Sequence, residues 1–131
     1  MRSVSYYVHA RRWLSELEFF QLEVSFLGRL LADYFIRLTA DRQCCQKLKG
    51  SEENLVKLEK EISELAMQLQ EHIHLIDRES RRPAGGGEAL AARQVAMDIR
   101  IAKLTGRYRH TKCKLFDVVA AIVSKNKLLA G

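Results

Sequence analysis

Residues 55–76 read LVKLEKEISELAMQLQEHIHLI, and the apolar residues of this stretch recur at alternating steps of three and four. This spacing keeps them on one side of an α-helix, whereas a strand would need alternation at every second residue. The one polar residue on the stripe is His72. The stretch therefore predicts a long amphipathic helix. Its stripe consists of Leu55, Leu58, Ile62, Leu65, Leu69, His72 and Ile76.

The same spacing recurs on both sides of this stretch. The earlier segment carries it at Trp13, Leu17, Phe20, Val24, Leu27, Leu31, Tyr34 and Leu38. The later segment carries it at Leu90, Gln94, Met97, Ile101, Leu104, Tyr108, Thr111, Leu115, Val118 and Ile122, with polar residues at two of these positions. The chain therefore contains three heptad-patterned segments, and each predicts a helix.

The composition agrees with a helical bundle. The chain has 131 residues, of which 47% are hydrophobic, with seven Gly and one Pro. This is the size of one domain, and it is apolar enough to build a core. So few turn-forming residues argue against a turn-rich β fold. We predict an all-α, elongated antiparallel three-helix bundle with coiled-coil-like packing, because helices of about 30–40 residues are roughly 45–60 Å long.

Glycine and proline predict where the helices end. We place the first helix at about 8–42, the second at about 51–80 and the third at about 88–129, within a single domain 1–131. Gly50 is expected to end one helix and Ser51 to cap the next. The only Pro and the only Gly run lie in 81–87, which predicts a flexible connection. Gly106 allows a bend or a close helix approach within the third helix.

The first helix carries a second apolar face. Phe19 and Phe26 lie opposite its main stripe, in positions that should face water in a three-helix bundle, and Leu22 and Leu30 lie nearby. One explanation is that this helix is central and has neighbours on both sides. The other is that the face is buried in a homodimer or by a partner helix. Burial of two Phe and two aliphatic side chains would contribute roughly 6–10 kcal/mol before the cost of association.

Charge is unevenly distributed along the chain. Residues 51–82 contain five Lys/Arg and eight Asp/Glu, whereas residues 83–131 contain nine and three. One explanation of the basic third helix is a solvated face that is partly neutralised by the acidic second helix. The alternative is sequence-independent, salt-sensitive contact with nucleic acid or another acidic partner. The candidate contacts are Arg100, Lys103, Arg107, Arg109, Lys112 and Lys114.

The chain carries few residues in patterns typical of a reactive site. Glu71 and His74 have the Glu-x-x-His spacing of carboxylate-bridged metal bundles, but the chain has no second copy of it, so a metal-binding bundle is only a distant alternative. The adjacent Cys44 and Cys45 lack the spacing of a redox or zinc motif, and we interpret them as small apolar residues. No residue set supplies both a nucleophile or base and a recognisable site. We expect no enzymatic activity, no cofactor, no catalytic residue and no bound metal.

The sequence also indicates where the chain works. No apolar run reaches the ~18 residues that a membrane-spanning helix needs. The first residues, MRSVSYYVHARRW, lack the apolar core of a secretory signal, and three Cys make no disulfide framework. These observations favour a cytoplasmic protein.

Three segments carry a resemblance. FFQLEVSFLGRLLADYF at 19–35, residues 55–76 quoted above, and KCKLFDVVAAI at 112–122 are similar to stretches of small helical-bundle proteins of Bacteroidota with no known function. The resemblance implies a helical bundle and transfers no catalytic or binding residue. From the sequence we therefore expect an interaction or scaffolding protein that self-associates through Phe19, Leu22, Phe26 and Leu30.

Overall fold

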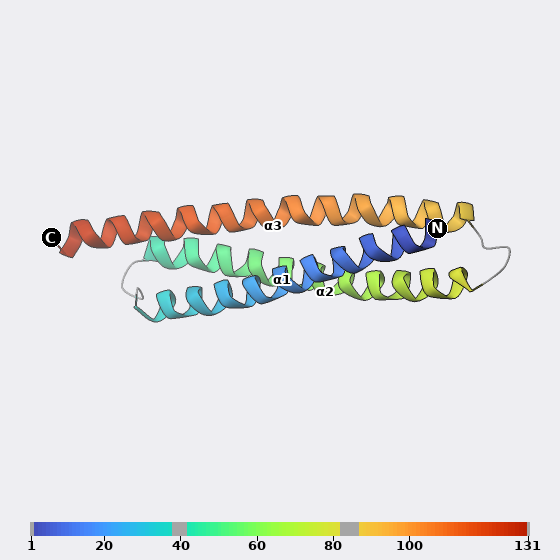
Figure 1. Ribbon diagram of the computed structural model, residues 1–131. Coiled ribbons are helices and arrows are strands. Elements are labelled where there is room, and N and C mark those ends of the chain that lie inside the picture. The colour runs from blue at the N-terminus through green and yellow to red at the C-terminus, as the bar shows by residue number, and fades with distance from the viewer. Residues whose placement is uncertain (1, 38–41, 82–86, 131) are drawn as a thin grey trace.

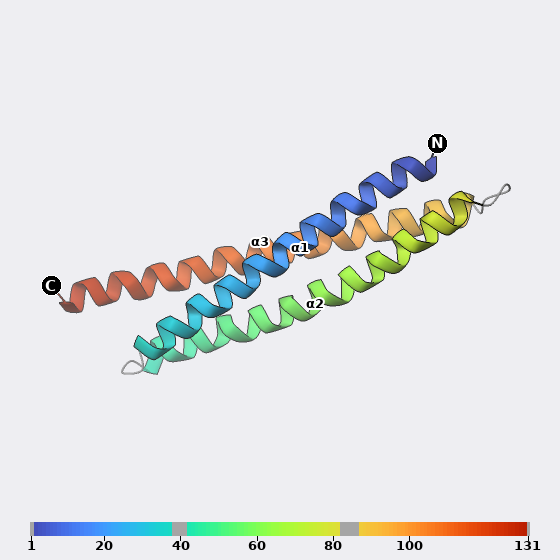
Figure 2. The ribbon, with the colours of Figure 1, turned by 60° about the horizontal axis from the view of Figure 1, so that its bottom comes forward.

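The computed structural model describes residues 2–37, 42–81 and 87–130, which form three α-helices packed side by side (Figure 1). The helices are α1 (Arg2–Arg37), α2 (Arg42–Ser80) and α3 (Gly87–Ala130). These ranges contain no strand. α1 and α3 run in one direction and α2 runs in the opposite direction, so the predicted all-α, elongated antiparallel three-helix bundle is confirmed (Figures 1 and 2).

α2 is the helix on which the other two pack. α1 and α3 each contact α2 more extensively than they contact each other. α1 lies obliquely in the bundle, crossing α2 in the view of Figure 1 and α3 in the view of Figure 2. All seven residues predicted to form the stripe of α2 are buried, and His72 among them is fully buried. The apolar stripe of one helix therefore supplies the packing surface for two neighbours.

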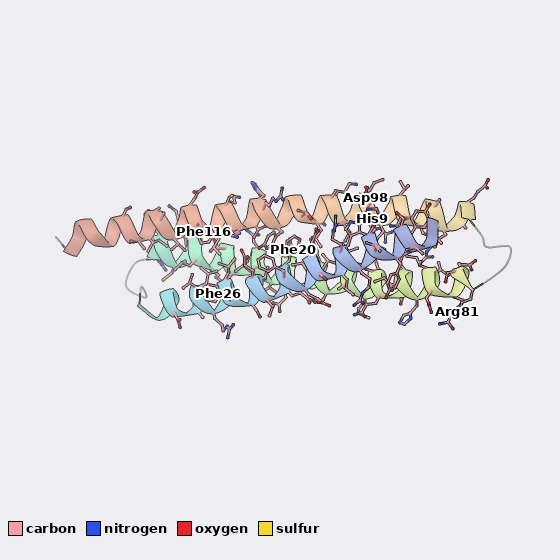
Figure 3. All side chains as sticks on the ribbon, viewed as in Figure 1. His9, Phe20, Phe26, Arg81, Asp98 and Phe116 are labelled. Atoms are coloured by element: carbon pink, nitrogen blue, oxygen red, sulfur yellow. The ribbon has the colours of Figure 1, made fainter. Side chains whose placement is uncertain are left out.

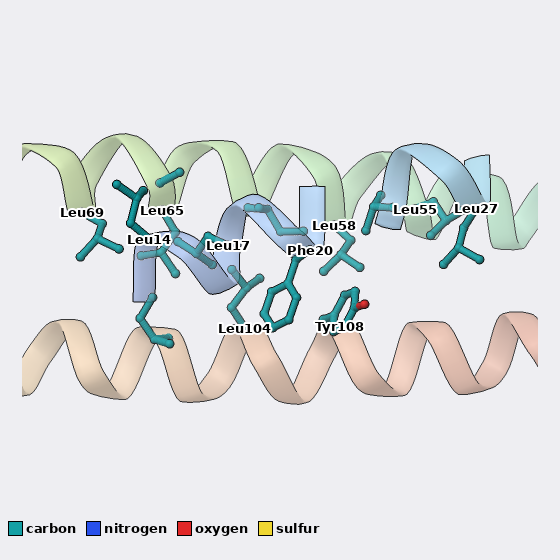
Figure 4. Close-up of a cluster of buried hydrophobic side chains, with 14 of the residues drawn as sticks. Leu14, Leu17, Phe20, Leu27, Leu55, Leu58, Leu65, Leu69, Leu104 and Tyr108 are labelled. Atoms are coloured by element: carbon teal, nitrogen blue, oxygen red, sulfur yellow. The ribbon is translucent and has the colours of Figure 1, made fainter. Parts of the chain in front are cut away.

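The stripes of α1 and α3 face this surface as predicted. On α1, the five stripe positions from Leu17 to Leu31 are buried, Trp13 is half-buried, and the last two positions lie outside the described side chains. On α3, Thr111 and Val118 are half-buried and the other eight positions are buried. Near mid-length, the rings of Phe20 and Tyr108 stack with centroids 4.0 Å apart, which joins α1 to α3 (Figure 4).

The predicted break at Gly50 is wrong. α2 begins at Arg42 and runs through Gly50 and Ser51 without interruption, nine residues before the predicted start. The backbone at Gly50 does not adopt a positive φ, so it does not have the left-handed conformation of a helix cap. Leu48, two residues earlier, is fully buried. The burial of this residue stabilises an extra helical segment in which glycine costs only about 1 kcal/mol.

The other boundaries differ less. α1 begins at Arg2, earlier than the predicted residue 8. Residue 42, where we expected the first helix to end, is the first residue of α2. Residues 82–86 of the predicted flexible connection lie outside the described residues. α3 matches the prediction to within one residue at each end. α3 is continuous at Gly106, and a Cβ atom placed there would meet nothing within 4 Å, so no close helix approach occurs at this glycine.

We expect Gly50→Ala to stabilise the protein. Gly50 is exposed and helical, and an added methyl group would meet no atom within 4 Å. Alanine should therefore raise the free energy of unfolding by about 0.5–1 kcal/mol, as measured by urea denaturation. Gly50→Pro at the same position should lower it by about 3 kcal/mol. A loss of stability in the alanine variant would instead indicate that Gly50 ends a helix.

Candidate interaction surfaces

The second apolar face of α1 is exposed to solvent. Phe19 and Phe26 each retain 57% of their accessible surface and Leu22 retains 73%, whereas Leu30 is half-buried at the margin. We call these four residues the outer α1 face. They follow one another at steps of three and four, so they form a continuous stripe over about three helical turns. Figure 3 places Phe26 nearer the end of α1 that lies beside the start of α2, and Phe20 nearer mid-helix.

Among the described residues, no helix covers the outer α1 face. α1 packs on α2 and α3 through its opposite side, where Leu17 and Leu27 are buried. The explanation that α1 is a central helix with neighbours on both sides is therefore wrong for the described part of the chain, because the central helix is α2. The other exposed large apolar side chains form shorter groups or stand singly. They are Val4, Tyr7 and Val8 on α1, Val56 and Met67 on α2, and Val95, Ile99 and Phe116 on α3. Single exposed apolar residues are normal on protein surfaces.

Acidic residues border the outer α1 face on the side toward α2. A shallow groove of about 430 Å³ runs between α1 and α2 beside Leu22, and the Gln21 amide donates a hydrogen bond across it to the Ser63 hydroxyl at 3.3 Å. The groove is lined by Glu18, Gln21, Leu22, Ser25, Glu59 and Ser63. Neither carboxylate makes an ion pair with a described residue. The groove therefore offers two uncompensated negative charges next to an apolar stripe.

The basic face of α3 is partly occupied by contacts within the chain. Arg107 donates to Glu61 of α2 at 2.7 Å, and Arg100 donates to the side-chain oxygen of Gln68 at 2.8 Å. Lys112 forms an ion pair with Glu23 of α1. Three of the six predicted polyanion contacts thus hold α3 to its neighbours, and among these only Arg107 is neutralised by an acidic residue of α2.

The other three predicted contacts, Lys103, Arg109 and Lys114, make no ion pair or hydrogen bond with the described residues. Lys114 lines a groove of about 260 Å³ between α2 and α3, together with Lys57 of α2 and His110. The sequence did not predict the contribution of α2, because Lys57 lies in a segment whose net charge is negative. Arg109 is exposed on α3 and does not line this groove.

The core contains a buried polar contact that the sequence did not predict. The Nε2 atom of His72 lies 2.6 Å from the side-chain oxygen of Gln94, and the Gln94 amide donates to the Tyr6 carbonyl at 3.4 Å. All three helices meet in this contact. The Nδ1 atom of His72 has no hydrogen-bond partner within the described residues. The signal was present, since both residues lie on predicted stripes, but heptad spacing within each helix does not say which residues of two helices meet.

The residues considered for metal binding do not form a ligand set in the structure. Glu71 and His74 are both exposed on α2. No group of three or more metal-ligating side chains comes together in the part of the chain that the structure describes. Cys45 is half-buried within α2, and Cys113 is exposed on α3.

The ion pair between Glu23 and Lys112 has an electrostatic consequence. The hydrogen bond from Lys112 lowers the pKa of the Glu23 carboxyl, against the opposing effect of burial. Burial raises the pKa of the neighbouring Tyr108 phenol, and the Glu23 charge adds to the shift. Glu23 is therefore ionised, and Tyr108 is neutral, at neutral pH.

Comparison of this chain with protein-family models, with curated proteins and with solved structures finds no match. The resemblance to helical-bundle proteins of Bacteroidota therefore stays a prediction. Among the described helices, none combines the length and the apolar character that a membrane crossing requires.

We expect Glu23→Gln to lower stability in a pH-dependent way. The folded state depresses the pKa of Glu23, so its contribution is present above the unfolded pKa of about 4.3 and is lost as the pH falls through the folded pKa. The variant should be less stable by about 0.5–1 kcal/mol at pH 7, and the difference should shrink below pH 4. Urea denaturation across this range measures it.

Glu16→Gln is the matched control for this prediction. Glu16 is exposed on α1, two helical turns before Glu23, and makes no ion pair with a described residue. The control should change stability little at any pH. An equal pH-dependent loss in both variants would contradict a specific contribution from the pair with Lys112.

Proposed function

We propose that this chain is a non-enzymatic helical scaffolding protein that self-associates through the outer α1 face. The observation that carries the proposal is the exposure of Phe19, Leu22 and Phe26 on successive turns of one helix. Monomeric soluble proteins rarely leave such a continuous apolar surface in water, and an exposed patch of this kind marks an interaction site.

The energetics favour association. Removing a large apolar side chain from water contributes roughly 1.5–3 kcal/mol, and in a symmetric pair each residue of the face is buried twice. The half-buried Leu30 would add less. This gain is comparable to the estimated cost of lost translational and rotational freedom, which is roughly 4–15 kcal/mol. We therefore expect a reversible dimer whose population rises with protein concentration.

The non-enzymatic part of the proposal rests on the sequence. None of the motifs considered there supplies a nucleophile, a base and a binding site together. The outer α1 face exposes three large apolar side chains, Phe19, Leu22 and Phe26. A rod with a self-complementary stripe on one side fits a structural or scaffolding role.

We expect Phe26→Asp to abolish dimer formation without unfolding the helices. Phe26 is more than half exposed in the monomer, so the substitution removes little intrachain packing, but it would place two charges inside the dimer contact. The dissociation constant should rise roughly 100-fold or more. Sedimentation equilibrium over low to high micromolar concentration measures association, and circular dichroism measures helicity.

Val95→Asp is the matched control. Val95 retains 60% of its accessible surface and lies on α3, which contacts α1 much less than α2 does. This variant should associate as the unmodified chain does. A monomer mass for the unmodified chain at high micromolar concentration would refute self-association, and so would an equal effect of both substitutions.

A second candidate function is sequence-independent binding of a nucleic acid or another acidic partner. The observation that favours it is the groove in which Lys57, His110 and Lys114 lie together on α2 and α3. Glu61 also lines this groove and pairs with Arg107 there, which reduces its net charge. Binding would depend on salt, because it would release counterions from the polyanion.

We expect Lys57→Glu combined with Lys114→Glu to remove any such binding. Fluorescence anisotropy with a labelled single strand and a labelled duplex at low salt tests this, and affinity of the unmodified chain should fall steeply at higher salt. The pair Arg78→Glu and Arg93→Glu makes the same reversal to glutamate at exposed positions of α2 and α3 outside this groove and should reduce affinity much less. Unmeasurable binding by the unmodified chain at low salt would exclude this candidate.

A further inference from the structure

We infer that the second copy docks on the outer α1 face in an antiparallel orientation, with the two-fold axis beside Leu22. This inference rests on the proposed self-association and specifies its geometry. Leu22 is the most exposed large apolar residue of the described chain and lies between Phe19 and Phe26 on the outer α1 face. In such a pair, two residues at equal distances before and after Leu22 lie opposite each other across the contact.

The charges on α1 fit this symmetry. Arg11 lies eleven residues before Leu22 and Asp33 lies eleven residues after it, each about 16 Å from the axis. Both side chains are exposed on the same side of α1 as Leu22, and neither makes an ion pair with a described residue. The antiparallel pair therefore places Arg11 of each copy opposite Asp33 of the other, twice.

The apolar and acidic flanks fit as well. Phe19 and Phe26 lie on one flank of the stripe, three residues before and four residues after Leu22, so Phe19 of one copy lies next to Phe26 of the other. Glu18 lies on the other flank, in the groove with Glu59. Arg29 of the second copy reaches this flank, because it lies seven residues from the axis and faces the acidic groove within about one turn of Glu18.

A parallel pair in register does not fit. It would place Arg11 against Arg11, Arg29 against Arg29 and Asp33 against Asp33, and like charges opposite each other disfavour association. It would also leave Glu18 and Glu59 facing no basic partner from the second helix. Charge complementarity therefore selects the antiparallel orientation.

Charge reversal in the full chain tests the orientation. Arg11→Asp and Asp33→Arg, made separately, should each weaken the dimer roughly tenfold, because each creates two like-charge contacts. The chain that carries both substitutions should return to within about twofold of the unmodified affinity. An equal mixture of the two single variants should form the heterodimer in preference to either homodimer. These effects should shrink at high salt.

The matched controls are Arg109→Asp and Asp117→Arg, which make the same charge changes at exposed positions on α3 and should leave dimer affinity unchanged. Sedimentation equilibrium measures all variants at low and high salt. A dimer that Phe26→Asp disrupts, but that neither charge reversal weakens, would overturn the antiparallel geometry and leave the proposed self-association standing. A monomeric unmodified chain would overturn both.

Discussion

The packing of two helices on the stripe of α2 is the constraint on which the rest of the structure depends. The stripe runs from Leu55 to Ile76 and is buried throughout, and both α1 and α3 lie against it. Since α1 and α3 contact each other less, their mutual positions are determined mainly by α2 and by a few cross-contacts such as the stack of Phe20 on Tyr108 (Figure 4). Each helix can bury only one side in this arrangement. Any second apolar side must remain exposed or find a partner outside the chain.

The sequence predicted the fold well because heptad spacing is a direct consequence of helix geometry. Stripe residues of all three helices are buried or half-buried wherever their side chains are described, including the polar His72 and Gln94. The prediction failed at Gly50, where a local preference for a helix end competed with the burial of Leu48 on the same helix. Tertiary packing outweighs a cost of about 1 kcal/mol at one glycine. In this chain, a single glycine is therefore weaker evidence for a helix end than heptad spacing is for a continuous helix.

Contacts between residues of different helices could not be predicted from the sequence. A heptad stripe determines which face of a helix is buried, but it does not determine the axial position of that helix against its neighbour. The contact of His72 with Gln94 and the pair of Arg107 with Glu61 both depend on that axial position. For the same reason the basic face of α3 could not be separated in advance into residues that hold the bundle together and residues that face water. The outer α1 face was predictable for the opposite reason. Its position opposite the stripe follows from the geometry of one helix alone.

A self-complementary surface needs more than apolar residues, since it must place unlike charges in positions that a two-fold axis exchanges. On α1, Arg11 and Asp33 carry opposite charges and lie eleven residues before and eleven residues after Leu22. A partner of a different sequence would impose no relation between the two ends of one helix. The symmetric placement of Arg11 and Asp33 about the most exposed residue of the stripe is therefore an argument for a second copy of this chain rather than for an unrelated helix. In the proposed dimer, the surface that the bundle leaves uncovered is the contact between the two bundles.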